Sequence, residues 1–246
     1  MISTYHRPQT LDEALTLLTQ PNTVPLGGGT LLSKPTTDSV AVVDLQCLGL
    51  DSLRVNGNEL VIGATCTLQS LLESEHSSAA LKSALKLEAP LNIRNTATVA
   101  GTLIASDGRS TFAAMLLAMD AKIELIENRQ PKIVSCGEFI LTRPSGLITS
   151  ITISLNTKSA FEFVSKTPAD KPIVGAAVVQ WNSGRTRLVL SGYGKTPLLA
   201  MDGTEADGIQ EAAKNAYHEA HDEWTSAEYR IDVAAVLAKR ALDALA

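Results

Sequence analysis

Three consecutive glycines, Gly27 to Gly29, follow a short apolar stretch and are closed by Thr30. Glycine has no Cβ atom, so the backbone of such a loop can approach a ligand closely, and its exposed N–H groups would suit a pyrophosphate. The same run can also form a plain tight turn after a strand. It matches neither the GxGxxG fingerprint nor a Walker loop, because the third spaced glycine and the Gly-Lys-Ser/Thr ending are missing.

A second group of residues suited to a phosphate lies in the segment 93–102, IRNTATVAGT. It offers several hydroxyls, a glycine and the guanidinium of Arg94. For Arg94 we favour a structural role, in which it holds an irregular loop together by hydrogen bonds to the backbone. No residue pattern in the chain indicates a general acid, a general base or a nucleophile.

The elements that must position these loops follow from periodicity and capping residues. We expect helices at 10–20, from 67, from 78 to before Pro90, and at 111–119, 204–223 and 226–245. We expect strands at 23–26, 40–45, 121–127, 148–155, 160–165, 174–181 and 185–191, and a hairpin with an Asn-Gly turn at 53–63. The hydroxyl-rich stretch 92–109 is predicted to be an ordered loop.

Composition indicates a globular protein of 246 residues, with 45% hydrophobic and 19% charged residues and a net charge of -5. No apolar run approaches the roughly 20 residues of a membrane helix, and the first ten residues do not resemble a signal peptide. We therefore expect a cytoplasmic protein without a membrane span. The absence of a Lys/Arg cluster argues against nucleic acid as a partner.

Two further clusters are open to more than one interpretation. His218, His221 and Asp222 have helical spacing and could bind a metal, although a solvated helix face is the better interpretation, so we predict no metal site. The cysteines, Cys47, Cys66 and Cys136, have no metal-binding or disulfide spacing and are expected to be buried. The last helix carries an apolar face that either packs on the core or docks a partner: Val233, Val236, Leu237, Ala241 and Ala244.

Six blocks in order resemble the FAD-binding medium subunit of the xanthine dehydrogenase and carbon monoxide dehydrogenase family, a group of molybdenum hydroxylases. The strongest are LGGGTLL at 26–32, IRNTATVAGTLIAS at 93–106 and LLAMDA at 116–121. The others are VIGATCTL at 61–68, SGYGKTPLLA at 191–200 and YRIDVAAVLAKRALDAL at 229–245. The resemblance implies an α+β fold, with a two-part FAD-binding domain of the vanillyl-alcohol-oxidase/PCMH type and a smaller α+β C-terminal domain, an antiparallel sheet with helices. The domains would span 1–157, with subdomains of about 1–52 and 53–157, and 158–246.

The resemblance also implies which residues hold FAD. The first loop would wrap the pyrophosphate with Val24, Pro25, Leu26, Gly27, Gly28, Gly29, Thr30 and Leu31. The second would contribute Thr98, Val99, Ala100, Gly101 and Thr102, where Ala100 and Thr102 depart from the family's Thr-x-Gly-Gly-Asn pattern.

Three positions outside the loops carry over by spacing. Thr111 stands where the family has an Asp that bonds cofactor hydroxyls, and we hypothesise that Asp107 or Arg109 replaces part of that contact. Ile148 would be an apolar wall. Lys166 would be a cation near the flavin, or equally a solvated lysine at a strand end.

By resemblance, this oxidoreductase subunit would take electrons from iron–sulfur clusters and pass them to an acceptor such as NAD or a quinone. The molybdenum-cofactor large subunit and the iron–sulfur small subunit would be separate chains, and the isolated chain would turn over little or no substrate. The alternative is a structural or binding subunit that has kept the fold and lost FAD. A free-standing FAD oxidase is a weaker third possibility, because the chain has no large substrate domain.

Overall fold

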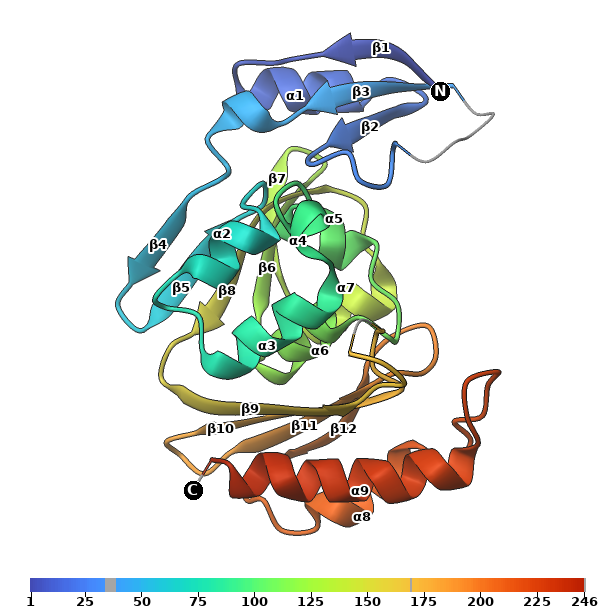
Figure 1. The fold of residues 1–246 in the computed structure, drawn as a ribbon. Coiled ribbons are helices and arrows are strands. Elements are labelled where there is room, and N and C mark those ends of the chain that lie inside the picture. The colour runs from blue at the N-terminus through green and yellow to red at the C-terminus, as the bar shows by residue number, and fades with distance from the viewer. Residues whose placement is uncertain (34–38, 169, 246) are drawn as a thin grey trace.

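The computed structural model describes residues 1–33, 39–168 and 170–245. Its strands form three sheets. Figure 1 shows the N-terminal sheet at one end of the molecule, a five-stranded sheet in the middle and the C-terminal sheet at the other end. This is the predicted α+β fold, with an antiparallel C-terminal sheet covered by helices.

The N-terminal unit is a small parallel sheet with one helix. Its elements are β1 (Ile2–His6), α1 (Leu11–Leu18), β2 (Thr23–Leu26) and β3 (Val40–Asp44), with β3 central, followed by the 3-10 turn η1 (Gln46–Leu48). Thr10 caps α1 by accepting the Glu13 N–H. The predictions of α1, β2 and β3 are confirmed. Strand β1 was not predicted, because it is almost wholly exposed and shows no apolar alternation.

The middle unit is an antiparallel sheet in the order β4-β5-β8-β6-β7. Its strands are β4 (Leu53–Asn56), β5 (Glu59–Gly63), β6 (Lys122–Glu127), β7 (Gln130–Ser135) and β8 (Leu147–Ser154), and α7 (Cys136–Thr142) follows β7. The predicted hairpin is confirmed. Gly57 takes a φ of +58°, as the tight turn between β4 and β5 requires.

Five helices belong to the same unit: α2 (Leu68–Glu73), α3 (Ala79–Glu88), α4 (Leu91–Arg94), α5 (Val99–Ile104) and α6 (Thr111–Ala118). Every residue of α6 is buried, which explains its apolar composition on all sides. The predicted loop at 92–109 is wrong, because α4 overlaps its start and α5 lies within it. Helices of four and six residues are too short for a periodic pattern and depend on tertiary packing, so the sequence did not reveal them.

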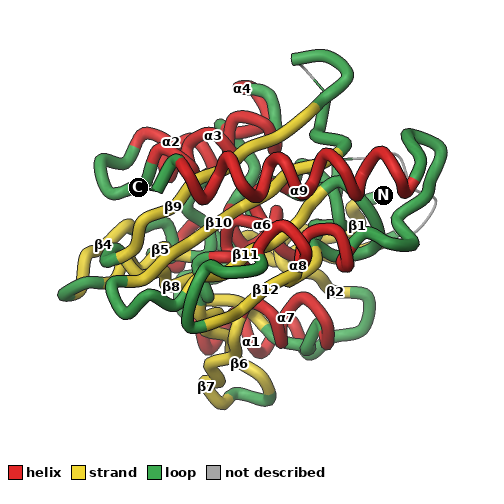
Figure 2. Tube along the Cα trace, turned by 90° about the horizontal axis from the view of Figure 1, so that it is seen from below, coloured by secondary structure: helices red, strands yellow, loops and turns green. Residues whose placement is uncertain are grey.

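The C-terminal sheet has the antiparallel order β12-β11-β10-β9. It contains β9 (Thr157–Val164), β10 (Val174–Trp181), β11 (Thr186–Ser191) and β12 (Leu198–Gly203). Figure 2 shows α8 (Ile209–Ala216) and α9 (Ala227–Asp243) lying across one face. Residues of the other face, such as Phe161, Ala177 and Val179, belong to the same core as α3 and α6. With both faces covered, β10 is apolar without a break from Val174 to Val179.

The helix predicted at 204–223 is wrong in its bounds, because α8 covers only Ile209–Ala216. Gly208, with a φ of +77°, stands at its N-terminal end, and the chain leaves the helix at Tyr217. The fully buried Tyr217 donates its hydroxyl to the Ser191 carbonyl at 2.8 Å, and this contact fixes the end of the helix. No helix within 1–33, 39–168 and 170–245 is long and apolar enough to cross a membrane.

Candidate cofactor-binding site

The two glycine-bearing loops lie against each other. A Cβ atom added to Gly27 would stand 2.7 Å from Thr98 Oγ1, and one added to Gly28 would stand 1.7 Å from the Thr96 carbonyl oxygen. Gly29 has a φ of +70°, which side chains rarely tolerate. Each glycine of the run is therefore required for a separate reason, and the plain-turn interpretation does not explain the close packing of Gly27 and Gly28.

The first loop presents N–H groups without protein acceptors. Within the described part of the chain, no hydrogen bond uses the amides of Gly27, Gly28, Gly29 or Thr30, although all four residues are only half-exposed. Backbone N–H groups at such depth pair with protein, water or ligand. Adjacent unpaired amides form a concave donor set that suits a phosphate group.

The second loop differs in this respect, because its amides are already used. Val99 N donates to the Cys66 carbonyl at 2.9 Å, and Ala100 N donates to the Ala64 carbonyl at 3.2 Å. Gly101 N donates to Thr98 Oγ1 at 3.2 Å, which caps α5. This loop can form a wall of a site, but it does not offer these donors to an anion.

Three cavities adjoin the loops and share lining residues. The largest, about 430 Å³, is lined by Gly27, Gly28, Gln46, Asp51, Thr65, Cys66, Thr67, Ser70, Asn95, Thr96 and Thr98. A cavity of about 60 Å³ shares Gly27 and Thr98 with it and adds Pro25, Ala100, Gly101 and Ile148. A third cavity, of about 200 Å³, shares Gly101 with the second one. It is also lined by Thr30, Leu31, Thr102, Glu88 and Lys171.

Most of the predicted site residues are therefore brought together around these cavities. The residues that line them are Pro25, Gly27, Gly28, Thr30, Leu31, Thr98, Ala100, Gly101, Thr102 and Ile148. Val24, Leu26 and Gly29 belong to the same first loop and strand without lining a cavity, and Val99 is fully buried in the core.

Thr111 is not brought together with the other residues. Its side chain is fully buried at the start of α6, and its hydroxyl donates to the Ala84 carbonyl at 2.7 Å. Glu88 Oε2 lies 3.3 Å from Thr111 Oγ1. Thr111 thus holds α3 and α6 together.

Sequence reasoning missed Glu88 and Lys171, which line the third cavity. Glu88 Oε2 accepts from Ser110 Oγ at 2.8 Å and from Phe112 N at 3.0 Å, and Oε1 accepts from Lys171 Nζ at 2.9 Å. Glu88 ends its own helix, where the helix dipole disfavours an anion, but it faces the N-terminus of α6, where the dipole favours one. Partners 22 to 83 residues away leave no local sequence signal.

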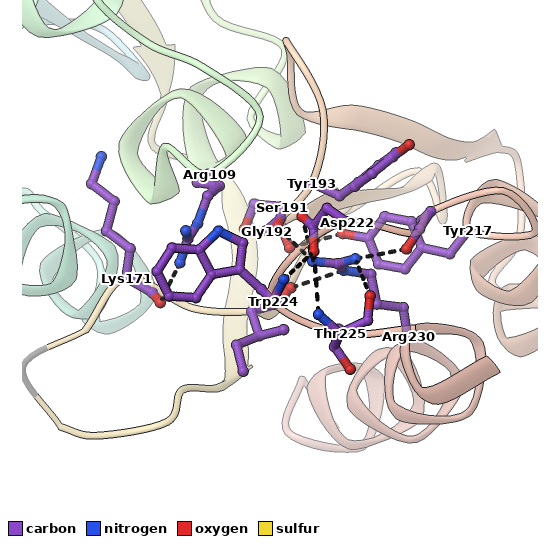
Figure 3. A network of polar contacts seen from close by, with 12 residues as sticks. Arg109, Lys171, Ser191, Gly192, Tyr193, Tyr217, Asp222, Trp224, Thr225 and Arg230 are labelled. Atoms are coloured by element: carbon purple, nitrogen blue, oxygen red, sulfur yellow. Dashed lines mark hydrogen bonds and ion pairs between the residues drawn. The ribbon is translucent and has the colours of Figure 1, made fainter. Parts of the chain in front are cut away.

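Lys166 and Arg109 both lie against Trp224 and line none of the three cavities. Lys166 Nζ is 5.0 Å from the ring centroid, and the guanidinium of Arg109 is 4.3 Å from it. Arg109 also donates to the Lys171 carbonyl at 3.2 Å (Figure 3). Asp107 accepts the Arg109 N–H at 2.9 Å within its own turn. The contacts of Arg109 fasten the 107–109 turn to Trp224 and to the segment between β9 and β10.

The structural role of Arg94 is confirmed. Its Nε donates to Gln69 Oε1 at 2.9 Å, and its Nη1 donates to the Ala89 carbonyl at 2.7 Å. The guanidinium ties α4 to α2 and to the end of α3, so its partners lie in neighbouring elements and not in the backbone of the loop predicted around it.

The cysteines follow the prediction in two cases out of three. Cys66 and Cys136 are buried, and burial raises the pKa of Cys66 to about 11 and that of Cys136 to about 12, which keeps both as thiols. Cys47 is only half-buried, and its Sγ accepts from Arg7 Nε at 3.2 Å. The prediction of burial is wrong for Cys47, because it lies in the short turn after β3.

The predicted helical spacing of His218, His221 and Asp222 does not exist, because these residues follow the end of α8. Both carboxylate oxygens of Asp222 instead accept from Nη2 of the buried Arg230, as Figure 3 shows. In the described ranges, no group of three or more His, Cys, Asp or Glu side chains could hold a metal ion.

Two abutting loops beside cavities, with unpaired amides on one of them, are the arrangement of a protein that binds a phosphate-containing ligand. The family described as the FAD binding domain in molybdopterin dehydrogenase matches residues 1–155, and the chain belongs to this family. It is therefore an FAD-binding oxidoreductase subunit.

Relatives match over nearly the whole chain. The chain is 29% identical to the protein YgfM of Escherichia coli K12, over 96% of this chain and 94% of YgfM. It is 28% identical to the carbon monoxide dehydrogenase medium chain of Afipia carboxidovorans, over 97% of this chain and 95% of that one. The structure of CO dehydrogenase from Oligotropha carboxidovorans superposes with a TM-score of 0.82 at 28% identity, covering 99% of this chain and 98% of that one.

Proposed function

We propose that this chain holds FAD with the pyrophosphate on the amides of Gly27 to Thr30 and with the second loop as the opposite wall. The observation that carries the proposal is the set of unpaired amides beside the cavities. FAD supplies the redox chemistry when it is bound. The chain's own residues orient the cofactor, with Ile148 as an apolar surface and Thr98 fixing the distance between the loops.

The departures at Ala100 and Thr102 do not weigh against this proposal. The amide of Ala100 is bonded to the Ala64 carbonyl, so a glycine at position 100 is not needed to bring a free N–H to the cofactor. Thr102 lines a cavity and keeps a hydroxyl there. The alternative of a subunit that has lost FAD therefore has no specific support from the loop geometry.

We further propose that the chain works as an electron-transfer subunit, accepting electrons from the iron–sulfur clusters of a small subunit and passing them to an acceptor such as NAD or a quinone. The similarity to a medium chain of carbon monoxide dehydrogenase supports this role. A molybdenum-cofactor large subunit on another chain would turn over the substrate, and a cytoplasmic location stays a prediction, as does the division into domains 1–157 and 158–246.

In the test, the chain is first loaded with FAD. It is then mixed anaerobically with its native partner subunits, which have been reduced beforehand. We expect the flavin absorption to bleach when the partners are added and to recover when the acceptor is added. The isolated loaded chain, given the substrate alone, should not bleach. Unchanged flavin absorption in the presence of reduced partners would contradict the electron-transfer role without contradicting FAD binding.

A further inference from the structure

A buried carboxylate lines the cavity that begins where the glycine loop ends. The side chain of Glu88 is 7% exposed and lines the cavity of about 200 Å³ together with Thr30 and Gly101. Thr30 is the last of the four residues with unpaired amides. A group in this cavity would therefore lie directly next to a pyrophosphate bound on the first loop.

The hydrogen bonds to Glu88 are distributed unequally between its two oxygens. Oε2 accepts from Ser110 Oγ and from Phe112 N, and it lies 3.3 Å from Thr111 Oγ1, whose hydrogen goes to the Ala84 carbonyl. Oε1 accepts only from Lys171 Nζ among the described residues, at 2.9 Å. An ionised carboxylate has about four lone-pair sites, two on each oxygen. Oε1 therefore retains one acceptor site for a further donor.

The charge of the carboxylate is compensated at the site. The Lys171 ammonium pairs with it, and the N-terminus of α6 presents the Phe112 amide to it. Lys171 is fixed in turn through its backbone, because its carbonyl accepts from Arg109 Nη2 at 3.2 Å. The acceptor on Oε1 is thus held in place from both domains, as a binding group must be.

We propose that Glu88 Oε1 accepts a hydrogen bond from a cofactor hydroxyl next to the pyrophosphate, on the ribityl chain or on the ribose. Hydroxyl groups flank the pyrophosphate of FAD on both sides, and a carboxylate is their strongest acceptor among protein groups. This inference rests on the proposed function. Lys171 acts as a positioning residue for Glu88, and neither Asp107 nor Arg109 makes the contact.

The test is the variant Glu88→Gln, which keeps the shape and removes the charge. Titration of purified protein with FAD, followed by flavin fluorescence, should show a loss of affinity of about tenfold or more, the size expected for a charge-assisted hydrogen bond. Parallel titrations with FMN, which has the ribityl chain, and with ADP, which has the ribose, identify the source. A loss of affinity for FMN alone supports a contact with a ribityl hydroxyl, and a loss of affinity for ADP alone supports a contact with a ribose hydroxyl.

A matched control is Glu59→Gln, which also removes a carboxylate paired with a lysine, Lys122, at 3.0 Å, but away from the three cavities. Its affinity for FAD should equal that of the wild type. Wild-type FAD affinity in Glu88→Gln, or equal losses for FMN and ADP, would overturn the inference. If the wild type itself binds no FAD, the proposed function fails instead.

A second measurement does not depend on the folding of the variant. Wild-type protein is titrated with FAD analogues that each lack a single ribityl or ribose hydroxyl. We expect one analogue to bind about tenfold or more weakly, and the others to bind as FAD does. Equal affinity for FAD and all the analogues would overturn the inference.

Discussion

At the scale of single residues, the glycines of the first loop matter because the absence of side chains lets this loop pack directly against the second loop. Gly28 is the most constrained, because a Cβ atom there would lie 1.7 Å from a backbone oxygen of the facing loop. Backbone cannot rotate away as a flexible side chain does. The two loops would therefore have to separate to admit even a methyl group.

We predict that Gly28→Ala weakens FAD binding by about tenfold or more, since a displacement of the order of 1 Å at a binding group has effects of this size. Isothermal titration of the purified variant with FAD measures the change. The control is Gly57→Ala in the β4–β5 turn, where the added Cβ meets nothing within 4 Å.

The control should lose about 1 kcal/mol of stability, because its φ is positive, while keeping wild-type FAD affinity. Undiminished FAD affinity in Gly28→Ala would show that the loops do not need their close contact.

The residue types of the first loop were readable from the sequence, since three glycines and a threonine are contiguous. Glu88 and Lys171 were not, because their roles arise only when α3, α6 and the segment before β10 meet in space. For Lys166, the sequence left a cation near the flavin and a solvated lysine equally open, and its ammonium lies 5.0 Å from the centroid of the Trp224 ring. Spacing along the chain locates a residue in an element, but it does not determine which way a long side chain points.

At the scale of elements, the buried Arg230 joins α9 to the segment 217–225 and to the sheet. Its Nη2 donates to both oxygens of Asp222 at 2.9 Å, its Nη1 donates to the Ala220 carbonyl at 2.6 Å, and Tyr193 stacks on it (Figure 3). The side chain is fully buried. The loss of one partner would leave several acceptors unpaired in the interior.

We predict that Arg230→Met lowers the free energy of unfolding by about 3 to 5 kcal/mol, the cost of breaking a buried ion pair. Urea unfolding followed by circular dichroism measures the change. Lys239→Met is the control, because Lys239 forms an exposed pair with Asp243 in the same helix and should change stability by less than about 1 kcal/mol. A change below that value for Arg230→Met would contradict the account.

A second set of contacts joins β11 and β12 to the end of α6. Asp202 accepts from Arg185 and Arg187, and both arginines also pair with Asp120. Hydrogen bonds from Arg185, followed by those from Arg187, lower the pKa of Asp202 from 3.8 to about 2. A lowered pKa of an acid stabilises the folded state above the unfolded pKa, and this stability is lost as the pH falls through the folded value.

We predict that wild type exceeds Asp202→Asn in the free energy of unfolding by about 2 kcal/mol above pH 5, the equivalent of this pKa shift. The difference should shrink between pH 3.8 and about 2, where the folded carboxylate becomes protonated. Chemical unfolding of both proteins across this range is the measurement. A difference as large at pH 2 as at pH 7 would refute the ionic contribution.

The long, strongly patterned elements were the ones that sequence reasoning located. Helix α9 and strands β10 and β11 bury most of one or both faces, so their periodicity is clear. Within α9, however, Val236 is 47% exposed, and the buried positions are Arg230, Ala234, Ala235, Leu237, Ala238 and Ala241. In the sequence, two adjacent faces of this helix are similarly apolar. Packing against the C-terminal sheet determines which of the two faces is buried.

At the scale of the whole molecule, the cofactor cleft lies between units that share packing. Leu147, from the middle sheet, belongs to the small core of the N-terminal unit, and the C-terminal sheet contributes Phe161 and Val189 to the core of the middle unit. The Lys171–Glu88 pair joins the segment between β9 and β10 to α3 at the third cavity. We infer that FAD affinity and the stability of the unit contacts are coupled.

The most direct test of the central claim is the flavin content of the purified chain. The protein is incubated with excess FAD and desalted, and its visible absorption spectrum is recorded and converted to flavin per chain. We expect about one FAD to be retained per chain at micromolar protein concentration, which corresponds to a Kd below about 1 μM. A desalted protein that is folded by circular dichroism and carries no flavin bands would contradict it.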